Sequence, residues 1–267
     1  MNGPAFLQQH SGVLRTQAGA AFPGSHAVFR GKNLHRDLQQ LEWVALYAYG
    51  ITGRQPTPEQ TELLQALWVS TSYPDARLWN NRVAALAATA RSSANLGVIA
   101  GMAVSEATVY GGNAGLRAMR FLQTTLARVQ AGEPLEDIVW AEQAQRRIYG
   151  YGRPISSIDE RLPVVLPIAE RLGYGHGPHL ALARRIETIL LSRYPNLRMN
   201  FAAPHAALMA DMGFSLREYQ LLRVPAFLAG MGPCVMEAAE KPEGAVFPTS
   251  CAGVAYAGPA ARPWVRR

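Results

Sequence analysis

Histidines are the first residues in this sequence whose types and spacing could carry chemistry. His176 and His179 could offer two imidazoles to a metal ion, with His205 as a third. No cysteine or carboxylate stands at a diagnostic ligand spacing from them, which disfavours a metal centre. We therefore interpret these histidines as loop and helix residues and predict no metal site.

Serine pairs and a glycine-rich loop are the next candidates. Ser92-Ser93 and Ser156-Ser157 do not lie in a Gly-x-Ser-x-Gly elbow, so we interpret them as polar groups of helices or loops. Gly150-Tyr151-Gly152 resembles a fragment of a phosphate-binding loop. It lacks the third glycine and the Gly-Lys-Ser/Thr ending, and no convincing strand precedes it, so a nucleotide-binding fingerprint is not expected.

Arginine dominates the charge of the chain. Its 267 residues include 26 Lys and Arg against 19 Asp and Glu, a net charge of +7, and only Lys32 and Lys241 are lysines. The arginines are scattered rather than gathered in a basic stripe with aromatics, so nucleic-acid binding is not expected. Guanidinium groups suit carboxylates and phosphates, which favours a small anionic ligand.

The remaining composition favours a globular protein. With 49% hydrophobic and 17% charged residues, the chain can bury a large core as one large domain or two smaller ones. The longest apolar stretch is interrupted by polar residues, and the N-terminus lacks a signal-peptide pattern, so we expect neither a membrane partner nor export. Cys234 and Cys251 form no CxxC pair, which fits a cytoplasmic protein.

Helical periodicity dominates the chain and predicts a mostly α fold. The first residues, 1–24, suggest an arm or short hairpin. Thr57-Pro58 is typical of a capped helix start, and the small-residue tract 77–109 predicts tightly packed helices that are also a candidate dimer interface. Short strands are predicted only at 246–248 and 254–256. We expect helices over about 38–50, 57–68, 77–109, 116–131, 135–147, 161–172, 178–194, 202–212 and 216–229.

A series of short motifs, in one order along the chain, gives a more specific pattern. These motifs are Phe29–Leu38, Tyr49–Thr57, Asp75–Arg77, Tyr110–Ala114, Tyr149–Ile155, Asp159–Arg161 and Met199–Ala202 with Met212-Gly213. In order and spacing they resemble the citrate synthase family, in the short form also used by citryl-CoA lyases. Tyr110-Gly111-Gly112-Asn113-Ala114, for example, is similar to the family's His-Gly-Gly-Ala-Asn.

The resemblance implies a fold and an activity. It implies an almost all-α homodimer, with a large helical domain formed by residues 1–112 and 212–267 and a small helical domain formed by residues 113–211. Family members condense an acyl-CoA with a 2-oxo acid such as oxaloacetate, or run the related cleavage. A CoA thioester would then be a substrate, and no bound cofactor is implied.

The catalytic positions implied by the resemblance are altered in this sequence. The three family histidines correspond to Ala76, Tyr110 and Arg153, and the aspartate corresponds to Ala202. If the register follows Pro195-Asn196 instead, the aspartate position is Arg198. Each missing acid or base would cost about 10²- to 10⁴-fold in rate, so ordinary citrate synthesis by the family mechanism is not expected.

Other residues could build a different site at these positions. Tyr110 and Arg153 could stabilise a developing oxyanion, and His205, one helical turn beyond Ala202, could act as a base unless it is an ordinary helix-surface histidine.

The proposed substrate-binding residues complete this picture. They are Arg161, which matches a carboxylate-binding arginine of the family, with Asp75, Arg77 and Lys241. Phe227 stands in place of another family arginine, which favours a smaller or less charged ligand. Two hypotheses follow: a non-canonical enzyme acting on an acyl thioester or 2-oxo acid, or a catalytically silent binding or regulatory homologue.

Overall fold

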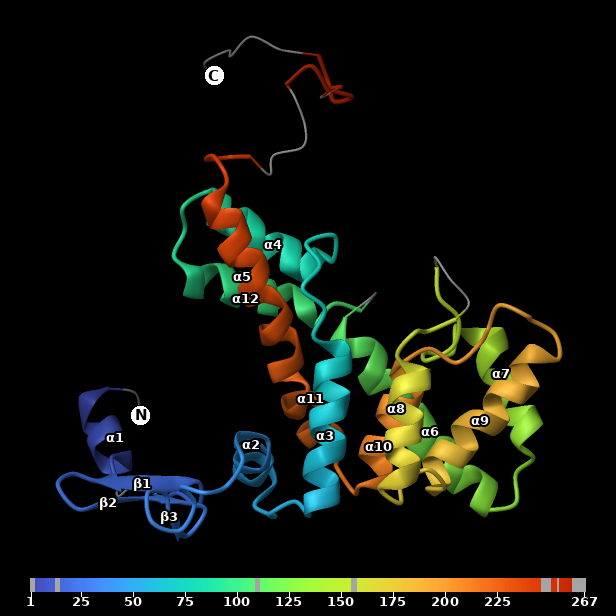
Figure 1. Ribbon diagram of the computed structural model, residues 1–267, viewed down its shortest axis with the longest axis horizontal. Helices are drawn as coiled ribbons and strands as arrows, with labels where there is room; N and C mark the ends of the chain where they lie inside the picture. Colours follow the sequence, from blue (N-terminus) through green and yellow to red (C-terminus); the bar gives the residue numbers. More distant parts are fainter. Residues whose placement is uncertain are drawn as a thin grey trace. The chain divides into compact units, whose positions relative to one another are not determined.

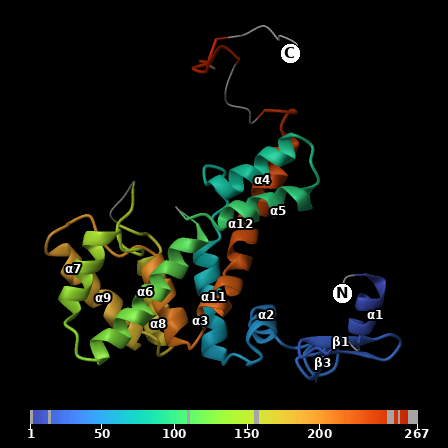
Figure 2. The ribbon, with the colours of Figure 1, turned by 180° about the vertical axis from the view of Figure 1, so that it is seen from behind.

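The computed structural model describes residues 3–12, 15–108, 111–154, 158–245, 251–253 and 255–260 (Figures 1 and 2). It is mostly helical, as the sequence predicts. The chain forms two compact units. Unit 1 comprises Met1–Thr71 and Thr108–Pro225, and unit 2 comprises Ser72–Ala107 and Ala226–Arg267.

The N-terminal part of unit 1 carries a short helix and a small antiparallel sheet. Helix α1 (Pro4–His10) precedes strands β1 (Gly19–Phe22), β2 (His26–Phe29) and β3 (Lys32–Asn33), which pair in that order. An arm or short hairpin is expected over residues 1–24, whereas the hairpin of β1 and β2 extends to Phe29 and helix α1 precedes it. After β2, Arg30 donates from Nε to the carbonyl of Gly50, which ties the sheet to the end of the next helix.

Two helices follow. Helix α2 (Trp43–Thr52) begins later than the periodicity from Leu38 predicts, and it ends at Gly53, whose φ of 71° is a left-handed conformation that glycine adopts readily. Helix α3 (Pro58–Thr71) begins after the predicted cap, because the Thr57 hydroxyl accepts from the Gln60 amide at 3.2 Å. Leu63, Leu64 and Leu67 of α3 are completely buried.

The helical body of unit 1 is built around α10 (Ala202–Asp211), in which nearly every residue is buried. It packs against α6 (Gly112–Gln130) and α9 (Pro178–Leu191). Figures 1 and 2 show these helices side by side. Around them lie α7 (Leu135–Gln145), which contacts α9, α8 (Leu162–Arg171), which contacts α3, and α11 (Leu216–Leu222), which contacts α2 and α6.

Unit 2 is a smaller helical cluster. Helices α4 (Trp79–Thr89) and α5 (Ala94–Ser105) pack closely as a hairpin, and α12 (Val224–Glu240) contributes Met231, Cys234, Val235 and Ala238 to the core that contains α4. Small residues allow the close approach, since Ala84, Ala88 and Cys234 are buried in one cluster with Met231. A side chain at Gly101 would overlap the Asn80 carbonyl and Met231, so α4 and α5 need glycine there.

Some sequence expectations differ from the structure. The helix predicted over 216–229 is divided at Arg223 and continues to Glu240. The predicted strand 246–248 lies outside the described residues, and Ala255 and Tyr256 are not in a strand. The domain division at 112 and 211 stays a prediction, and the compact units divide the chain elsewhere.

One segment, Leu216–Glu240, is long and apolar enough to span a membrane by length and composition alone. It comprises α11 and α12. Tyr219, Leu222, Met231 and Val235 of this segment are buried against other helices, as expected for core helices of a folded protein.

Candidate active site

The glycine loop before Arg153 is fixed against the segment that leads into α10. Gly152 donates its amide to the Arg198 carbonyl at 2.7 Å, and Asn200 donates its amide to the Gly150 carbonyl at 2.9 Å. Gly150 has a φ of 99°, and a side chain there would meet Ala203. Glycine is therefore required at position 150 by both conformation and space. This arrangement places Arg153 beside the start of α10.

Asp159 is the charged centre of this region. Its side chain is completely buried, and it accepts from Nε and Nη2 of Arg161 at 2.8 and 2.7 Å and from the Phe201 amide at 2.8 Å. Burial raises the pKa of Asp159, but the Arg161 guanidinium outweighs it, and the net pKa lies below the ordinary value. The carboxylate thus stays ionised and holds Arg161 over the Phe201 ring, 4.5 Å from its centre.

Arg153 lies near the same carboxylate. Its Nε lies 4.0 Å from Asp159 Oδ2, and its Nη1 donates to the Ile158 carbonyl at 2.7 Å and to Glu160 at 2.6 Å. Its side chain remains 26% exposed. The structure therefore brings Arg153 and Arg161 together on one buried carboxylate, and each side chain stays partly exposed.

His205 lies on α10 and is 7% exposed, so the alternative of a helix-surface histidine is wrong. Its ring lies 5.3 Å from the Phe201 ring and meets the Tyr219 ring edge to face at 5.1 Å. Burial first, and then the charges of Arg223 and Arg161, lower the pKa of His205 to about 3. At neutral pH the ring is therefore uncharged and can both donate and accept a hydrogen bond.

Tyr219 and Arg223 extend this region and were not singled out in the sequence. Both are buried, and the Arg223 guanidinium lies 5.8 Å from the centre of the Tyr219 ring. Burial raises the pKa of Tyr219 to about 12, although Arg223 opposes the rise. The sequence signal for Arg223 was an arginine within the long apolar segment of α11 and α12, a position where a charge is costly unless it has a role.

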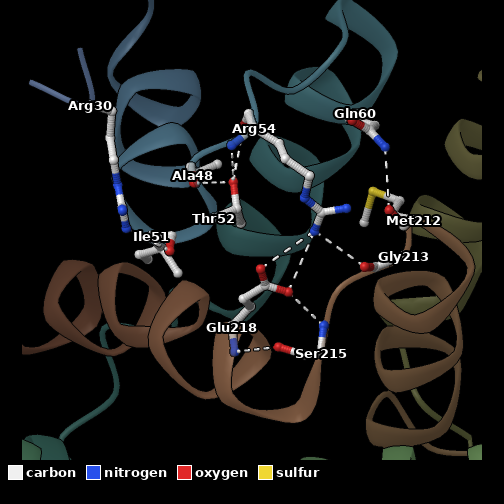
Figure 3. A network of polar contacts seen from close by, with 10 residues as sticks. All are labelled: Arg30, Ala48, Ile51, Thr52, Arg54, Gln60, Met212, Gly213, Ser215 and Glu218. Carbon is white, nitrogen blue, oxygen red and sulfur yellow. Dashed lines mark hydrogen bonds and ion pairs between the residues drawn. The ribbon is translucent and has the colours of Figure 1, made fainter. Parts of the chain in front are cut away.

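A polar network connects the start of α11 to the end of α2 and to the segment after α10 (Figure 3). Arg54, after α2, donates to the Gly213 carbonyl at 3.2 Å and lies 3.5 Å from the Glu218 carboxylate. Ser215 and Glu218 cap each other at the start of α11. Because residues 212–215 connect α10 to α11, this network fixes Tyr219 and Arg223 relative to His205.

The other predicted site residues lie elsewhere. Asp75 and Arg77 form an exposed ion pair in unit 2, with Nη2 of Arg77 2.6 Å from the carboxylate. Lys241, also in unit 2, pairs with Glu237 at 2.7 Å. Tyr110 lies outside the described residues. The structure thus brings together Arg153, Arg161 and His205 in unit 1, and the roles of all seven residues stay predictions.

The histidines considered as metal ligands have other partners. His179 Nδ1 lies 2.7 Å from Asp211, which also accepts the His179 and Leu180 amides at the start of α9. His176 pairs with Glu170 on the surface. In the described part of the chain, no three His, Cys, Asp or Glu side chains come together as a metal site.

A hollow of about 400 Å³ lies beside this region. It is lined by Asp159, Glu187 and Arg198 together with apolar side chains of α8. Two of its three charged lining residues are carboxylates, so the hollow by itself favours an apolar rather than an anionic part of a ligand.

Comparison with known proteins identifies the family to which this fold belongs. The model of the citrate synthase C-terminal domain matches residues 13–242, most of the chain. The chain belongs to the citrate synthase family. No curated protein sequence matches it.

Among solved structures, this family member is similar to the citryl-CoA lyase of Hydrogenobacter thermophilus. The TM-score is 0.83 with 22% identity, over 95% of this chain and 98% of the other. ATP citrate lyase of Methanothrix soehngenii, solved with citrate and coenzyme A, gives a TM-score of 0.76 with 15% identity, over 97% of this chain and 45% of the other.

Citrate synthase of the archaeon Thermoplasma acidophilum gives a TM-score of 0.68 with 17% identity, over 84% of this chain and 59% of the other. At these identities the similarities establish the short citrate-synthase-like fold. They do not transfer a substrate.

Proposed function

We propose that this protein is a non-canonical enzyme of the citrate synthase family that forms or cleaves a carbon–carbon bond between an acyl thioester and a 2-oxo acid. The observation that carries the proposal is the convergence of Arg153 and Arg161 on buried Asp159, beside the neutral ring of His205. Guanidinium groups held by a fixed carboxylate are preorganised to stabilise charge that develops on a carbonyl oxygen.

The proposed reaction is a condensation or, in the reverse direction, a cleavage, and both use the same side chains. In condensation, a proton leaves the carbon next to the thioester carbonyl, that carbon attacks the ketone of the oxo acid, and the ketone oxygen becomes a hydroxyl. Arg153 and Tyr110 would stabilise the oxyanions. His205 would take the proton once substrate binding counters the burial and the two guanidinium charges that lower its pKa.

The remaining parts of the proposal concern binding. Arg161 would bind a carboxylate of the small anionic ligand, and Asp75, Arg77 and Lys241 are proposed as further substrate-binding residues. A CoA thioester enters as a substrate, and we propose no bound cofactor. Its relatives of known structure include one solved with citrate and coenzyme A, which supports testing both ligands. We place the protein in the cytoplasm, away from membranes and nucleic acid.

We also propose a homodimer formed through α5. One face of this helix is apolar and exposed, with Leu96 and Ile99 61% and 62% exposed. An apolar hollow of about 390 Å³, lined by Trp79, Val83 and Val104, lies in the same helical hairpin. A second copy would cover this face. Ile99→Glu should convert the dimer to a monomer in light scattering, and an unchanged mass would contradict this interface.

The alternative is a catalytically silent binding or regulatory homologue. One observation favours it: Arg153 already contacts Ile158 and Glu160, and Arg161 already donates to Asp159 from Nε and Nη2. Such contacts could serve structure alone. The alternative predicts ligand binding or partner binding without turnover.

The test is an assay of oxaloacetate consumption in the presence of acyl thioesters, together with oxaloacetate release from citryl-CoA in the reverse direction. Arg153→Gln should lower the rate by about 10²-fold or more, because it removes a charged oxyanion donor. Arg185→Gln, on the exposed face of α9, is the matched control and should retain the wild-type rate. Equal rates in wild type and Arg153→Gln would contradict the mechanism.

A further inference from the structure

The hollow of about 400 Å³ follows one face of α8. Its apolar lining residues are Ile158, Leu162, Pro163, Leu166, Pro167 and Met199. The four that belong to α8 recur at the spacing of a single helix face, so the apolar surface is continuous along the helix. The volume lies within the range of about 300–1,000 Å³ that is typical of small-molecule sites. The hollow is therefore large enough for an apolar group of several carbon atoms.

The hollow shares residues with the candidate active site. Asp159 lines it and accepts two hydrogen bonds from Arg161. Arg198 also lines it, and the Arg198 carbonyl accepts the amide of Gly152, the residue before Arg153. An apolar group in the hollow would thus lie beside the segments that carry both arginines of the proposed reaction.

The charges that line the hollow disfavour a negatively charged group. The Asp159 carboxylate is already paired with Arg161, which leaves Glu187 and Arg198. Glu187 is partly buried, and in the described part of the chain it accepts the Met199 amide at 2.7 Å and pairs with no cation. Arg198 is exposed, so water screens its charge more strongly than that of Glu187. The lining therefore favours a neutral apolar group over an anionic one.

We propose that this hollow holds the acyl chain of the thioester and that the enzyme prefers a neutral acyl group of medium length, such as hexanoyl, to acetyl. This assignment rests on the proposed function, because the chain is taken to belong to its thioester substrate. Leu162 and Leu166 contact the chain, and Glu187 excludes acyl groups that end in a second carboxylate. Binding also removes the Ile158 side chain, which is 66% exposed, from water.

The experiment is calorimetric titration of the full chain with acetyl-CoA, hexanoyl-CoA and adipoyl-CoA in the absence of oxaloacetate. Hexanoyl-CoA should bind about 10- to 100-fold more tightly than acetyl-CoA, because each further buried methylene strengthens binding by about fourfold. Adipoyl-CoA has the same chain length but ends in a carboxylate, so its affinity should fall back to that of acetyl-CoA. The ratio of kcat/KM values for hexanoyl-CoA and acetyl-CoA, measured by oxaloacetate consumption, should follow the ratio of the affinities.

Leu166→Trp should fill the hollow. Leu166 is only partly buried, so the larger side chain can enter the hollow without displacing the core. The variant should lose the preference for hexanoyl-CoA and keep the wild-type affinity for acetyl-CoA. Val164→Trp is the matched control, because Val164 is on the same helix, is 55% exposed and is not among the lining residues. It should keep the wild-type preference.

Glu187→Gln removes the charge without changing the size of the side chain, and its amide oxygen can still accept the Met199 amide. It therefore tests the proposal even if Leu166→Trp folds poorly. Adipoyl-CoA should bind about 3- to 10-fold more tightly than to wild type, because a like charge is removed, and the affinity for hexanoyl-CoA should stay unchanged. An unchanged affinity for adipoyl-CoA would overturn the role of Glu187.

The outcomes separate this assignment from the proposed function. Equal affinities for acetyl-CoA and hexanoyl-CoA, or a preference that persists in Leu166→Trp, would overturn the assignment, and turnover of acetyl-CoA would still support the proposed function. A preference for hexanoyl-CoA that is lost in Leu166→Trp, in a protein that turns over none of the thioesters, would support the acyl-chain site and contradict the proposed function.

Discussion

Two Asp-x-Arg segments, one in each unit, have the same local geometry and different surroundings. In Asp75-Ala76-Arg77 and in Asp159-Glu160-Arg161, the arginine donates from Nε and Nη2 to the aspartate two residues earlier. The Asp75 and Arg77 side chains are 35% and 91% exposed, whereas those of Asp159 and Arg161 are 0% and 21% exposed. The Asp-x-Arg pattern alone does not predict which of the two pairs is buried.

The two aspartates differ in the other hydrogen bonds that their carboxylates accept. Asp159 also accepts the Phe201 amide, 42 residues away, and so joins the glycine loop to the start of α10. The Asp75 carboxylate bonds only within its own turn in the described contacts. A buried pair that connects distant segments can fix a site, whereas an exposed local pair is screened by water.

The largest expected effect concerns acid stability and His205. Its pKa of about 3 in the folded protein is below the ordinary 6.5, so the unfolded chain binds a proton first as pH falls. The stability is fully present above pH 6.5 and is lost as pH falls toward 3, by up to about 5 kcal/mol. His205→Phe should flatten this dependence in urea unfolding between pH 4 and 7. An unchanged slope would contradict a buried neutral ring.

The second prediction concerns removal of the charge of each aspartate by substitution with asparagine, which replaces one carboxylate oxygen by an amide nitrogen. Asp159→Asn should lower the free energy of unfolding by about 3 kcal/mol, because it leaves Arg161 and the Phe201 amide without their charged partner. Asp75→Asn should change it little, because that pair is exposed. Chemical denaturation measures both. Equal effects at the two sites would contradict the claim that burial distinguishes them.

The third prediction compares two helical glycines. Gly115→Ala should destabilise the protein by about 1–3 kcal/mol, because the added methyl overlaps the Tyr219 hydroxyl. Gly232→Ala in α12 meets nothing within 4 Å and should stabilise by about 1 kcal/mol through helix propensity. The double variant Gly115→Ala with Tyr219→Phe should recover part of the loss. Without such recovery, the close packing of α6 on Tyr219 would be refuted.

The smallest effect is expected at an exposed cap in unit 2. The Ser93 hydroxyl accepts from the Leu96 amide at the start of α5. Ser93→Ala should therefore cost about 1 kcal/mol in thermal unfolding, the ordinary value for an N-cap. The activity should remain unchanged. A loss of activity would show that this serine has a role beyond capping.

Much of the fold follows from the sequence, because local signals coincide with the elements. The Thr57 cap precedes α3, and the apolar period predicts α6, α9 and α10 within a few residues. The helix predicted over 216–229 is divided at Arg223, two residues before Pro225, which has no amide hydrogen for the helical hydrogen-bond ladder. Apolar periodicity alone does not reveal this division.

The candidate site is less predictable. His205 follows from its place near Ala202, but its burial depends on Phe201 and Tyr219, which only tertiary packing brings to it. Arg223 and Gly112 are 111 residues apart, so their contact has no local signature. The sequence motifs suggest Asp75, Arg77 and Lys241 as site residues, but their side chains are partly or largely exposed in the structure. A match to a motif therefore does not predict burial.

The most direct test of the central claim compares wild type with Arg153→Gln for oxaloacetate consumption in the presence of acyl thioesters and, in the reverse direction, for oxaloacetate release from citryl-CoA. The account predicts turnover in wild type that falls by about 10²-fold or more in the variant and is retained in Arg185→Gln. Binding of CoA and oxaloacetate by wild type without turnover in either direction would contradict it and establish the silent homologue.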